Sequence, residues 1–186
     1  MEKLNEEVLL KTPVFDVVKK TFKGTSFQPV GLKAKNWVTV VVYDDSGKCI
    51  LVKQTRWGSE QKTVEFPCGT VEEGETAIKA GLREFKEETG IELNENKERL
   101  VAHLNPNPAY FDNVFSIYAC EVGNVRLFFE HRYEQSLDKN EDCEVFVGDI
   151  TDVLLGSYSH GLMVAAYGLV WRNIARTRLE TIKDLC

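Results

Sequence analysis

The sequence predicts an α/β fold in which a mixed β-sheet carries helices on both faces. Residues 37–43 read WVTVVVY, a β-branched run that is typical of a strand buried on both faces. Residues 76–90 have helical periodicity and end at a glycine. Segments with strand and helix patterns follow one another as far as residue 178, and no internal repeat or low-complexity linker interrupts them. These observations favour a packed α/β domain.

We expect two regions in the chain. Residues 1–35 mix short apolar runs with lysines, and two or three short strands there should form a small N-terminal β lobe. Residues 36–186 should form the main domain. Within it, the turn Asp44 to Gly47 joins the first two strands as a hairpin, and Pro67 ends the third. The strands of the main domain are expected at residues 37–43, 49–53, 62–66, 99–104, 114–122 and 143–150.

The first helix should begin after Thr76 and end at Gly90, since glycine readily takes the left-handed conformation found at helix ends. At 100° per residue, Ile78, Leu82 and Phe85 gather on one side of this helix. A short helix is expected at residues 151–155 and a long one at residues 160–178. The expected inner face of the long helix includes Leu162, Ala166, Leu169 and Ile174.

Composition limits the classes of function. A chain of 186 residues with 43% hydrophobic content suits one domain with a substantial core. The net charge is −6 and no Lys/Arg run occurs, which argues against a nucleic-acid or anionic-membrane partner. The five cysteines lack zinc-type spacing, and no run of about 18 apolar residues occurs. We therefore expect a cytoplasmic protein with reduced thiols.

The other side of the first helix is acidic. Glu84, Glu87 and Glu88 are spaced i, i+3 and i+4, so their carboxylates lie close together. Three negative charges at this spacing destabilise a helix without bound cations by roughly a few tenths of a kcal/mol for each pair. A solvated acidic face is one reading. A divalent cation would reverse the cost, because Mg²⁺ and Mn²⁺ prefer hard oxygen ligands.

A longer pattern surrounds these glutamates. The stretch from residue 69 to residue 91 follows the spacing G-x5-E-x7-R-E-U-x-E-E-x-G-U, where U is a bulky aliphatic residue. It resembles the Nudix box of hydrolases that act on nucleoside diphosphates linked to another moiety. Phe85 stands where the first aliphatic residue is usual, and it stays apolar. The resemblance implies a Nudix-type α/β/α sandwich. The residues that carry it are Gly69, Glu75, Arg83, Glu84, Glu87, Glu88, Gly90 and Ile91.

By this resemblance, Glu84 and Glu88 coordinate a metal ion, Mg²⁺ or Mn²⁺, and Glu87 contributes directly or through water. The backbone carbonyl of Cys68 completes the metal shell. Arg83 orients the glutamates. Glu75, at a position where a carboxylate favours the helix N-terminus, is expected to be structural.

The sequence ahead of the box is similar to that of ADP-ribose pyrophosphatases. Gln54, Arg56, Glu65, Pro67 and Gly69 match that family's arrangement. The match places Arg56 and Glu65 at the substrate, and a guanidinium fork suits phosphate oxygens. It also implies a homodimer in which residues 1–35 pack on the partner.

The loop NPNPAYFDN at residues 105–113 departs from the family pattern, since Asn113 replaces an expected carboxylate. Its two prolines make it stiff, and its amides can read sugar hydroxyls or a base edge. Asn113 and Tyr110 are therefore candidate substrate-binding residues. Trp37, Trp57, Tyr110 and Phe111 could stack on a base or simply pack in the core.

A proton acceptor for the attacking water is expected in the acidic loop near residue 141. Glu141 is the first candidate, and Asp138, Asp142 and Glu144 compete with it. Each could also be a solvated loop charge. The three histidines, His103, His131 and His160, are expected to be structural.

Taken together, the sequence predicts metal-dependent hydrolysis of ADP-ribose to AMP and ribose phosphate. Two alternatives stay open. One is another Nudix substrate, either GDP-mannose or a diadenosine polyphosphate, and Tyr110 lies near the position where the diadenosine type carries a tyrosine. The other is a nucleotide sensor without catalysis, which the intact glutamates argue against.

Overall fold

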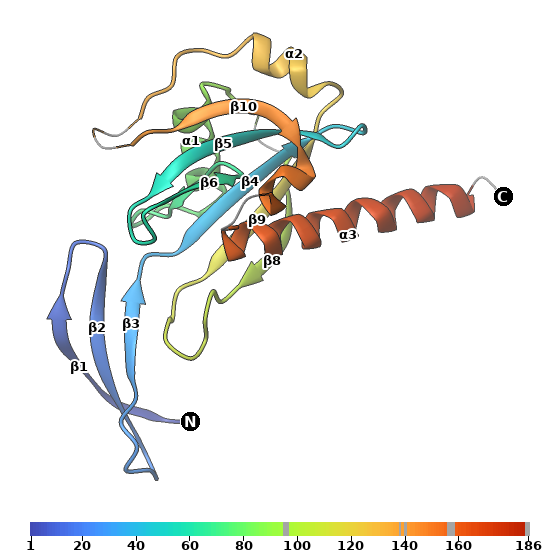
Figure 1. Ribbon diagram of the computed structural model, residues 1–186. Helices are drawn as coiled ribbons and strands as arrows, with labels where there is room; N and C mark the ends of the chain where they lie inside the picture. The colour runs from blue at the N-terminus through green and yellow to red at the C-terminus, as the bar shows by residue number, and fades with distance from the viewer. Residues whose placement is uncertain (95–96, 138, 140, 156–158, 185–186) are drawn as a thin grey trace.

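The computed structural model describes residues 1–94, 97–137, 139, 141–155 and 159–184. Its strands form two separate sheets (Figure 1). The smaller sheet has three antiparallel strands and lies in the first 34 residues, where short strands were predicted. Its strands are β1 (Lys3–Lys11), β2 (Phe15–Phe22) and β3 (Val30–Ala34).

The larger sheet has seven strands and is mixed, because β4 runs parallel to β9 while the other pairs are antiparallel. The order along it is β10, β5, β4, β9 and β8, with β6 paired to β5 and β7 paired to β4. The strands are β4 (Trp37–Tyr43), β5 (Lys48–Arg56), β6 (Gln61–Glu65), β7 (Cys68–Thr70), β8 (Arg99–Leu104), β9 (Phe115–Glu121) and β10 (Glu144–Asp149).

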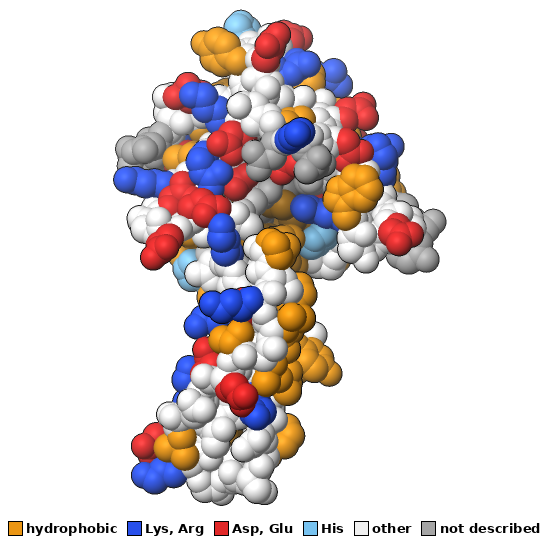
Figure 2. All heavy atoms as spheres, turned by 90° about the vertical axis from the view of Figure 1, so that its left-hand side faces the viewer, with side chains coloured by type: hydrophobic (Ala, Val, Ile, Leu, Met, Phe, Trp, Pro, Cys, Tyr) orange, Lys and Arg blue, Asp and Glu red, His pale blue; other side chains and the backbone are white. Residues whose placement is uncertain are grey.

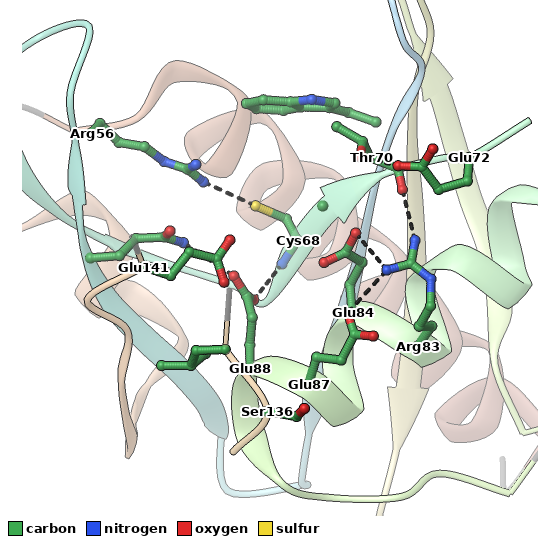
Figure 3. Close-up of a pocket in the computed structure, with 14 residues that line it drawn as sticks. Arg56, Cys68, Thr70, Glu72, Arg83, Glu84, Glu87, Glu88, Ser136 and Glu141 are labelled. Atoms are coloured by element: carbon green, nitrogen blue, oxygen red, sulfur yellow. Dashed lines mark hydrogen bonds and ion pairs between the residues drawn. The ribbon is translucent and has the colours of Figure 1, made fainter. Parts of the chain in front are cut away.

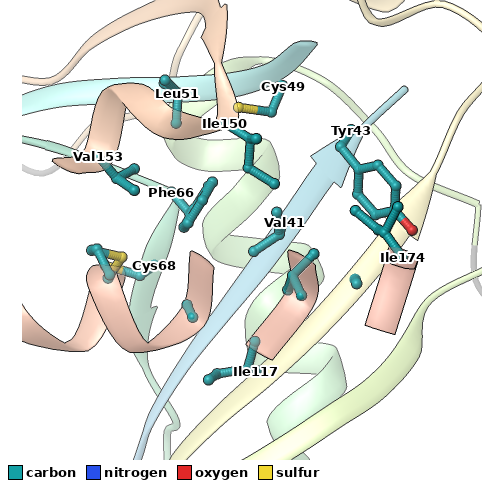
Figure 4. Close-up of a cluster of buried hydrophobic side chains, with 14 of the residues drawn as sticks. Val41, Tyr43, Cys49, Leu51, Phe66, Cys68, Ile117, Ile150, Val153 and Ile174 are labelled. Atoms are coloured by element: carbon teal, nitrogen blue, oxygen red, sulfur yellow. The ribbon is translucent and has the colours of Figure 1, made fainter. Parts of the chain in front are cut away.

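Helices cover both faces of this sheet. The helical elements are α1 (Ala77–Thr89), α2 (Val125–Glu130), the 3-10 helix η1 (Ile150–Leu154) and α3 (Gly161–Asp184). Alternate residues of β4 enter two hydrophobic cores: Val41 packs on the side of α3 and η1, and Val40 on the side of α1 and α2. Figure 4 shows the first of these cores. The predicted α/β/α sandwich is confirmed.

Two elements were not predicted, and one helix face was predicted correctly only in part. Neither α2, with six residues, nor β7, with three, is long enough to show a periodic pattern. The buried residues of α3 include Ala166 and Ile174, as predicted, but Met163 and Val170 replace Leu162 and Leu169. The latter two are half-buried at the edge of the core. The buried face of α3 is therefore rotated slightly about the helix axis from the predicted face.

The small sheet forms a lobe that projects from the main domain (Figure 1). The loop between β8 and β9 attaches it. Leu32 N donates to Tyr110 O at 2.6 Å, and Asn113 Nδ2 donates to Lys35 O at 2.9 Å. Figure 2 shows apolar side chains along one side of this lobe. Large apolar side chains that are exposed in the lobe are Met1, Leu4, Val8, Leu9, Leu10, Val14, Phe27 and Val30.

Within the described residues, none of the helices is both long and apolar enough to cross a membrane.

Candidate active site

Helix α1 begins and ends where the sequence predicts. The side chain of Thr76 caps its start by accepting a hydrogen bond from Lys79 N at 3.4 Å. At its end, Gly90 takes the left-handed conformation with φ of 71°, and its N–H donates to Lys86 O at 2.8 Å. These two caps set the ends of the helix that carries the acidic stretch.

A cavity of about 410 Å³ lies between α1, β7 and the end of β5 (Figure 3). The carboxylates of Glu84, Glu87 and Glu88 line one wall, and Glu141 lies beside Glu88 on the side away from Arg83. The lining residues are Trp37, Gln54, Arg56, Cys68, Gly69, Thr70, Glu72, Arg83, Glu84, Glu87, Glu88, Ser136, Leu137 and Glu141.

The three glutamates are not equivalent. Glu88 is only 4% exposed, and its Oε2 accepts from Cys68 N at 2.9 Å while Oε1 accepts from Gln54 Nε2 at 3.4 Å. Burial raises its pKa to about 8, and the nearby charge of Glu84 adds to the shift. Burial also raises the pKa of Glu84. The acidic face is therefore buried at Glu88 and only partly exposed at Glu84 and Glu87, so it is not simply a solvated surface.

Gly69 makes room for one of these carboxylates. A Cβ built on Gly69 would lie 2.0 Å from Glu84 Cδ and 2.3 Å from both of its carboxylate oxygens. The absence of a side chain at this point of β7 therefore allows Glu84 to lie directly against the strand.

Arg83 joins the glutamates into one network. Its Nη1 lies 2.9 Å from Glu84 Oε1 and donates to Glu87 Oε2 at 3.0 Å. Its Nη2 donates to Thr70 O at 3.0 Å and to Glu75 Oε2 at 3.1 Å. Glu75 thus fixes the guanidinium, which in turn holds two carboxylates against the β7 end of the cavity (Figure 3).

Arg56 lies on the opposite wall and is itself fixed. Its Nε and Nη2 donate to the two oxygens of Glu65 at 2.8 and 2.5 Å. The guanidinium also lies 5.5 Å from the centroid of the Trp37 ring. The carboxylate of Glu65 is wholly buried, so it reaches the cavity only through Arg56.

Among the candidates for the proton acceptor, Asp142 is already engaged. Its oxygens accept from Thr55 N at 2.8 Å and Thr55 Oγ1 at 2.7 Å, and Lys62 Nζ lies 3.1 Å away. Chiefly through the bonds from Thr55, the pKa of Asp142 is lowered to about 2. Glu144 is exposed on β10, and Asp138 lies outside the described residues. Glu141 lines the cavity.

The candidate substrate-binding residues separate into two groups. Trp37 and Arg56 line the cavity, and Trp57 lines an adjoining hollow together with Glu141. Tyr110 and Asn113 belong to the loop that attaches the lobe and lie outside the set that lines the cavity. The Tyr110 side chain is 60% exposed, whereas Asn113 is 8% exposed.

The donor chemistry of the cavity fits a divalent cation. Among the described residues, no three His, Cys, Asp or Glu side chains are gathered as a ready metal cage. Glu88 accepts protein N–H bonds, and Arg83 holds Glu84 and Glu87. Burial nevertheless raises the pKa of both Glu84 and Glu88, so a bound cation would favour their charged forms. Hard oxygen donors of this kind suit Mg²⁺ or Mn²⁺.

The buried carboxyl of Glu88 predicts a pH dependence of stability for the metal-free protein. Its pKa rises from 4.5 in the unfolded chain to about 8 in the fold, so the folded state binds more protons between these values. Stability from this group is present below pH 4.5 and is lost as pH rises to about 8. In chelator, the melting temperature should fall more steeply with rising pH in wild type than in Glu88→Gln. Parallel curves for the two proteins would contradict it.

Sequence reasoning missed several residues of the cavity wall. Ser136 and Leu137 line the cavity, yet no spacing pattern connects them to α1. Gln54 was part of the family resemblance, but its bond to Glu88 could not be read from the sequence. Such contacts depend on how distant segments pack.

Comparisons with known proteins agree with this geometry. The family model described as the NUDIX domain matches residues 33–150. The chain is 30% identical over 164 residues to an ADP-ribose pyrophosphatase of Bacillus subtilis (strain 168), covering 83% of this chain and 84% of that protein. It is 36% identical over 87 residues to an ADP-sugar pyrophosphatase of Mus musculus, covering 37% of this chain and 39% of that protein.

A third relative is a methanol dehydrogenase activator of Bacillus methanolicus, 33% identical over 84 residues, or 45% of this chain and 44% of that protein. A crystal structure described as an ADP compounds hydrolase has a TM-score of 0.68 and 21% identity, covering 95% of this chain and 96% of that one. At that identity the structural match shows the fold alone.

Proposed function

The chain belongs to the Nudix family and is a pyrophosphatase, and we propose that it hydrolyses ADP-ribose to AMP and ribose phosphate with a divalent metal ion. The observation that carries this proposal is the acidic cavity on α1 in a chain that matches an ADP-ribose pyrophosphatase along most of its length. The metal ion, Mg²⁺ or Mn²⁺, would be held by Glu84 and Glu88, with Glu87 and the Cys68 carbonyl completing the set. When bound, it would neutralise phosphate charge and polarise an oxygen of the attacked phosphoryl group.

The protein residues have separate tasks in the proposed reaction. Arg83 holds Glu84 and Glu87 in place. Arg56, fixed by Glu65, presents positive charge to a phosphate on the opposite wall. Glu141 accepts a proton from the attacking water. The water oxygen forms a bond to one phosphorus of the pyrophosphate, and the bridging oxygen leaves with the other phosphorus.

Substrate choice is proposed to depend on Trp37 and on the loop between β8 and β9. Trp37 lines the cavity beside Arg56, where its ring can stack on a base. Asn113 is bonded to Lys35 O, so we propose that it acts by fixing the loop and not by contacting the substrate. Tyr110, exposed on the same loop but outside the cavity lining, is proposed to affect substrate choice only through this loop.

A substrate panel tests this proposal. In the presence of Mg²⁺, kcat/KM should be highest for ADP-ribose, and GDP-mannose, diadenosine polyphosphates and dNTPs should be poorer. The readout is phosphate release after coupling to a phosphatase. A tenfold lead for a diadenosine compound or a dNTP would reject ADP-ribose as the substrate. Binding without turnover of any compound would favour the sensor alternative.

We also propose a two-fold homodimer with the lobe buried between subunits. The lobe of residues 1–35 is too small for its own core, since units below about 40 residues usually need a partner or a staple. Its exposed apolar side chains, among them Leu10 and Val14, are consistent with a covered face. Light scattering at micromolar concentration should give twice the chain mass of 21.1 kDa. A monomer under those conditions would reject the dimer.

A further inference from the structure

The segment before Glu141 is bonded to the last turn of α1. Tyr133 N donates to Gly90 O at 2.8 Å, and Ser136 N donates to Glu87 O at 2.9 Å. A side chain at Gly90 would prevent this approach, because its Cβ would lie 2.0 Å from Tyr133 O. The segment therefore follows the same part of the helix that carries the acidic cluster.

Gln135 adds a side-chain link within this segment. Its Nε2 donates to Glu88 O at 2.5 Å and to Cys143 O at 3.0 Å. Both partners are carbonyl oxygens, so only the amide NH₂ group can satisfy them, and it has one hydrogen for each. The half-buried side chain thus joins the backbone of α1 at Glu88 to the residue that precedes β10.

A second link lies on the other side of Glu141. Asp142 is bonded to Thr55 through both the backbone N–H and the hydroxyl, at 2.8 and 2.7 Å. Because Thr55 belongs to β5, this bond attaches the residue after Glu141 to the central sheet. Glu141 therefore lies in sequence between the attachment at Gln135 and the attachment at Asp142.

We infer that Gln135 is a positioning residue that fixes the carboxylate of Glu141 relative to Glu88, with Asp142 holding the other end of the segment. This inference rests on the proposed function, in which Glu141 accepts the proton of the attacking water.

Without the amide, the backbone carbonyls of Glu88 and Cys143 lose these donors. The backbone bonds from Tyr133 and Ser136 then hold this end of the segment to α1, and nothing from Gln135 joins it to the residue before β10. Misplacement of a reacting group by about 1 Å can lower a rate by about a hundredfold. A carboxylate that is only held less firmly should lower the rate by a smaller factor.

The test compares Gln135→Met, Glu141→Gln and the double variant with wild type, using ADP-ribose and Mg²⁺. Methionine has a similar length but no hydrogen to donate. We expect Gln135→Met to lower kcat about tenfold and leave KM within about twofold, and Glu141→Gln to lower kcat about a hundredfold. In the Glu141→Gln background, Gln135→Met should have no further effect on kcat. Glu134→Gln, an exposed neighbour on the same segment, is the matched control.

Hydrogen exchange of the backbone amides of residues 136, 137, 139, 141 and 142 is measured in the same proteins, and it should be faster in Gln135→Met. An unchanged kcat in Gln135→Met, or an equal loss in both backgrounds, overturns the inference and leaves ADP-ribose hydrolysis intact. Wild-type turnover in Glu141→Gln overturns it as well. If wild type does not hydrolyse ADP-ribose, the proposed function fails and the exchange rates decide the inference. Should Gln135→Met not fold, Gln135→Asn, which keeps the amide on a shorter chain, takes its place.

Discussion

Replacing Glu88 with glutamine is expected to lower the turnover of ADP-ribose by about a hundredfold or more while the fold is kept. Loss of a charged group that acts in the transition state has effects of this size. The fold should survive because burial already favours the neutral carboxyl, whose pKa is about 8. Glutamine has the shape of that neutral form, and its oxygen can still accept from Cys68 N.

The measurement is kcat at saturating ADP-ribose and Mg²⁺, with thermal unfolding of both proteins in chelator. Glu73→Gln is the matched control, because it removes the same charge from an exposed position in the same stretch. Its kcat should stay within about twofold of wild type. Full activity in Glu88→Gln, together with wild-type turnover that resists chelator, would reject the metal assignment.

The sequence predicted those parts of the fold that depend on local signals. The run at β4 and the caps of α1 at Thr76 and Gly90 were confirmed because propensity, periodicity and backbone conformation act within a few residues. The inner face of α3 was rotated from the prediction. Alternation of large and small apolar residues leaves several helix faces similarly hydrophobic, and packing against β9 and η1 chooses one.

The candidate site shows the same division. The residues on α1 could be found from their spacing, because one helix places them together. Gln135 bonds to Glu88 across a sequence separation of 47, and no local pattern reports such a contact. Sequence reasoning also did not predict burial. The family pattern assigned Glu65 to the substrate, but it gave no sign that the carboxylate of Glu65 is wholly buried. Charge and spacing indicated which groups are present, and tertiary packing determined which of them the cavity exposes.

Gly69→Ala is expected to lower turnover about as much as Glu88→Gln, by roughly a hundredfold, with little loss of stability. The added methyl group would overlap the carboxylate of Glu84, whose Cδ lies 2.0 Å from the position of the new Cβ. Since that carboxylate is the far end of a flexible side chain, it can rotate away without moving the backbone of β7. It would then leave its place beside Arg83 Nη1, which now lies 2.9 Å away.

Substitutions at two other glycines serve as controls for this prediction. At Gly58 no described heavy atom beyond the two chain neighbours lies within 4 Å of an added methyl group, so Gly58→Ala should leave kcat and thermal stability near wild type. At Gly90 the obstacle is the backbone oxygen of Tyr133 at 2.0 Å, and φ is 71°, so Gly90→Ala should instead destabilise the fold. For Gly69→Ala we expect a melting temperature within about 3 °C of wild type, a shift on the order of 1 kcal/mol for a chain of this size. Full activity in Gly69→Ala would mean that Glu84 can leave its position against β7 without loss of catalysis.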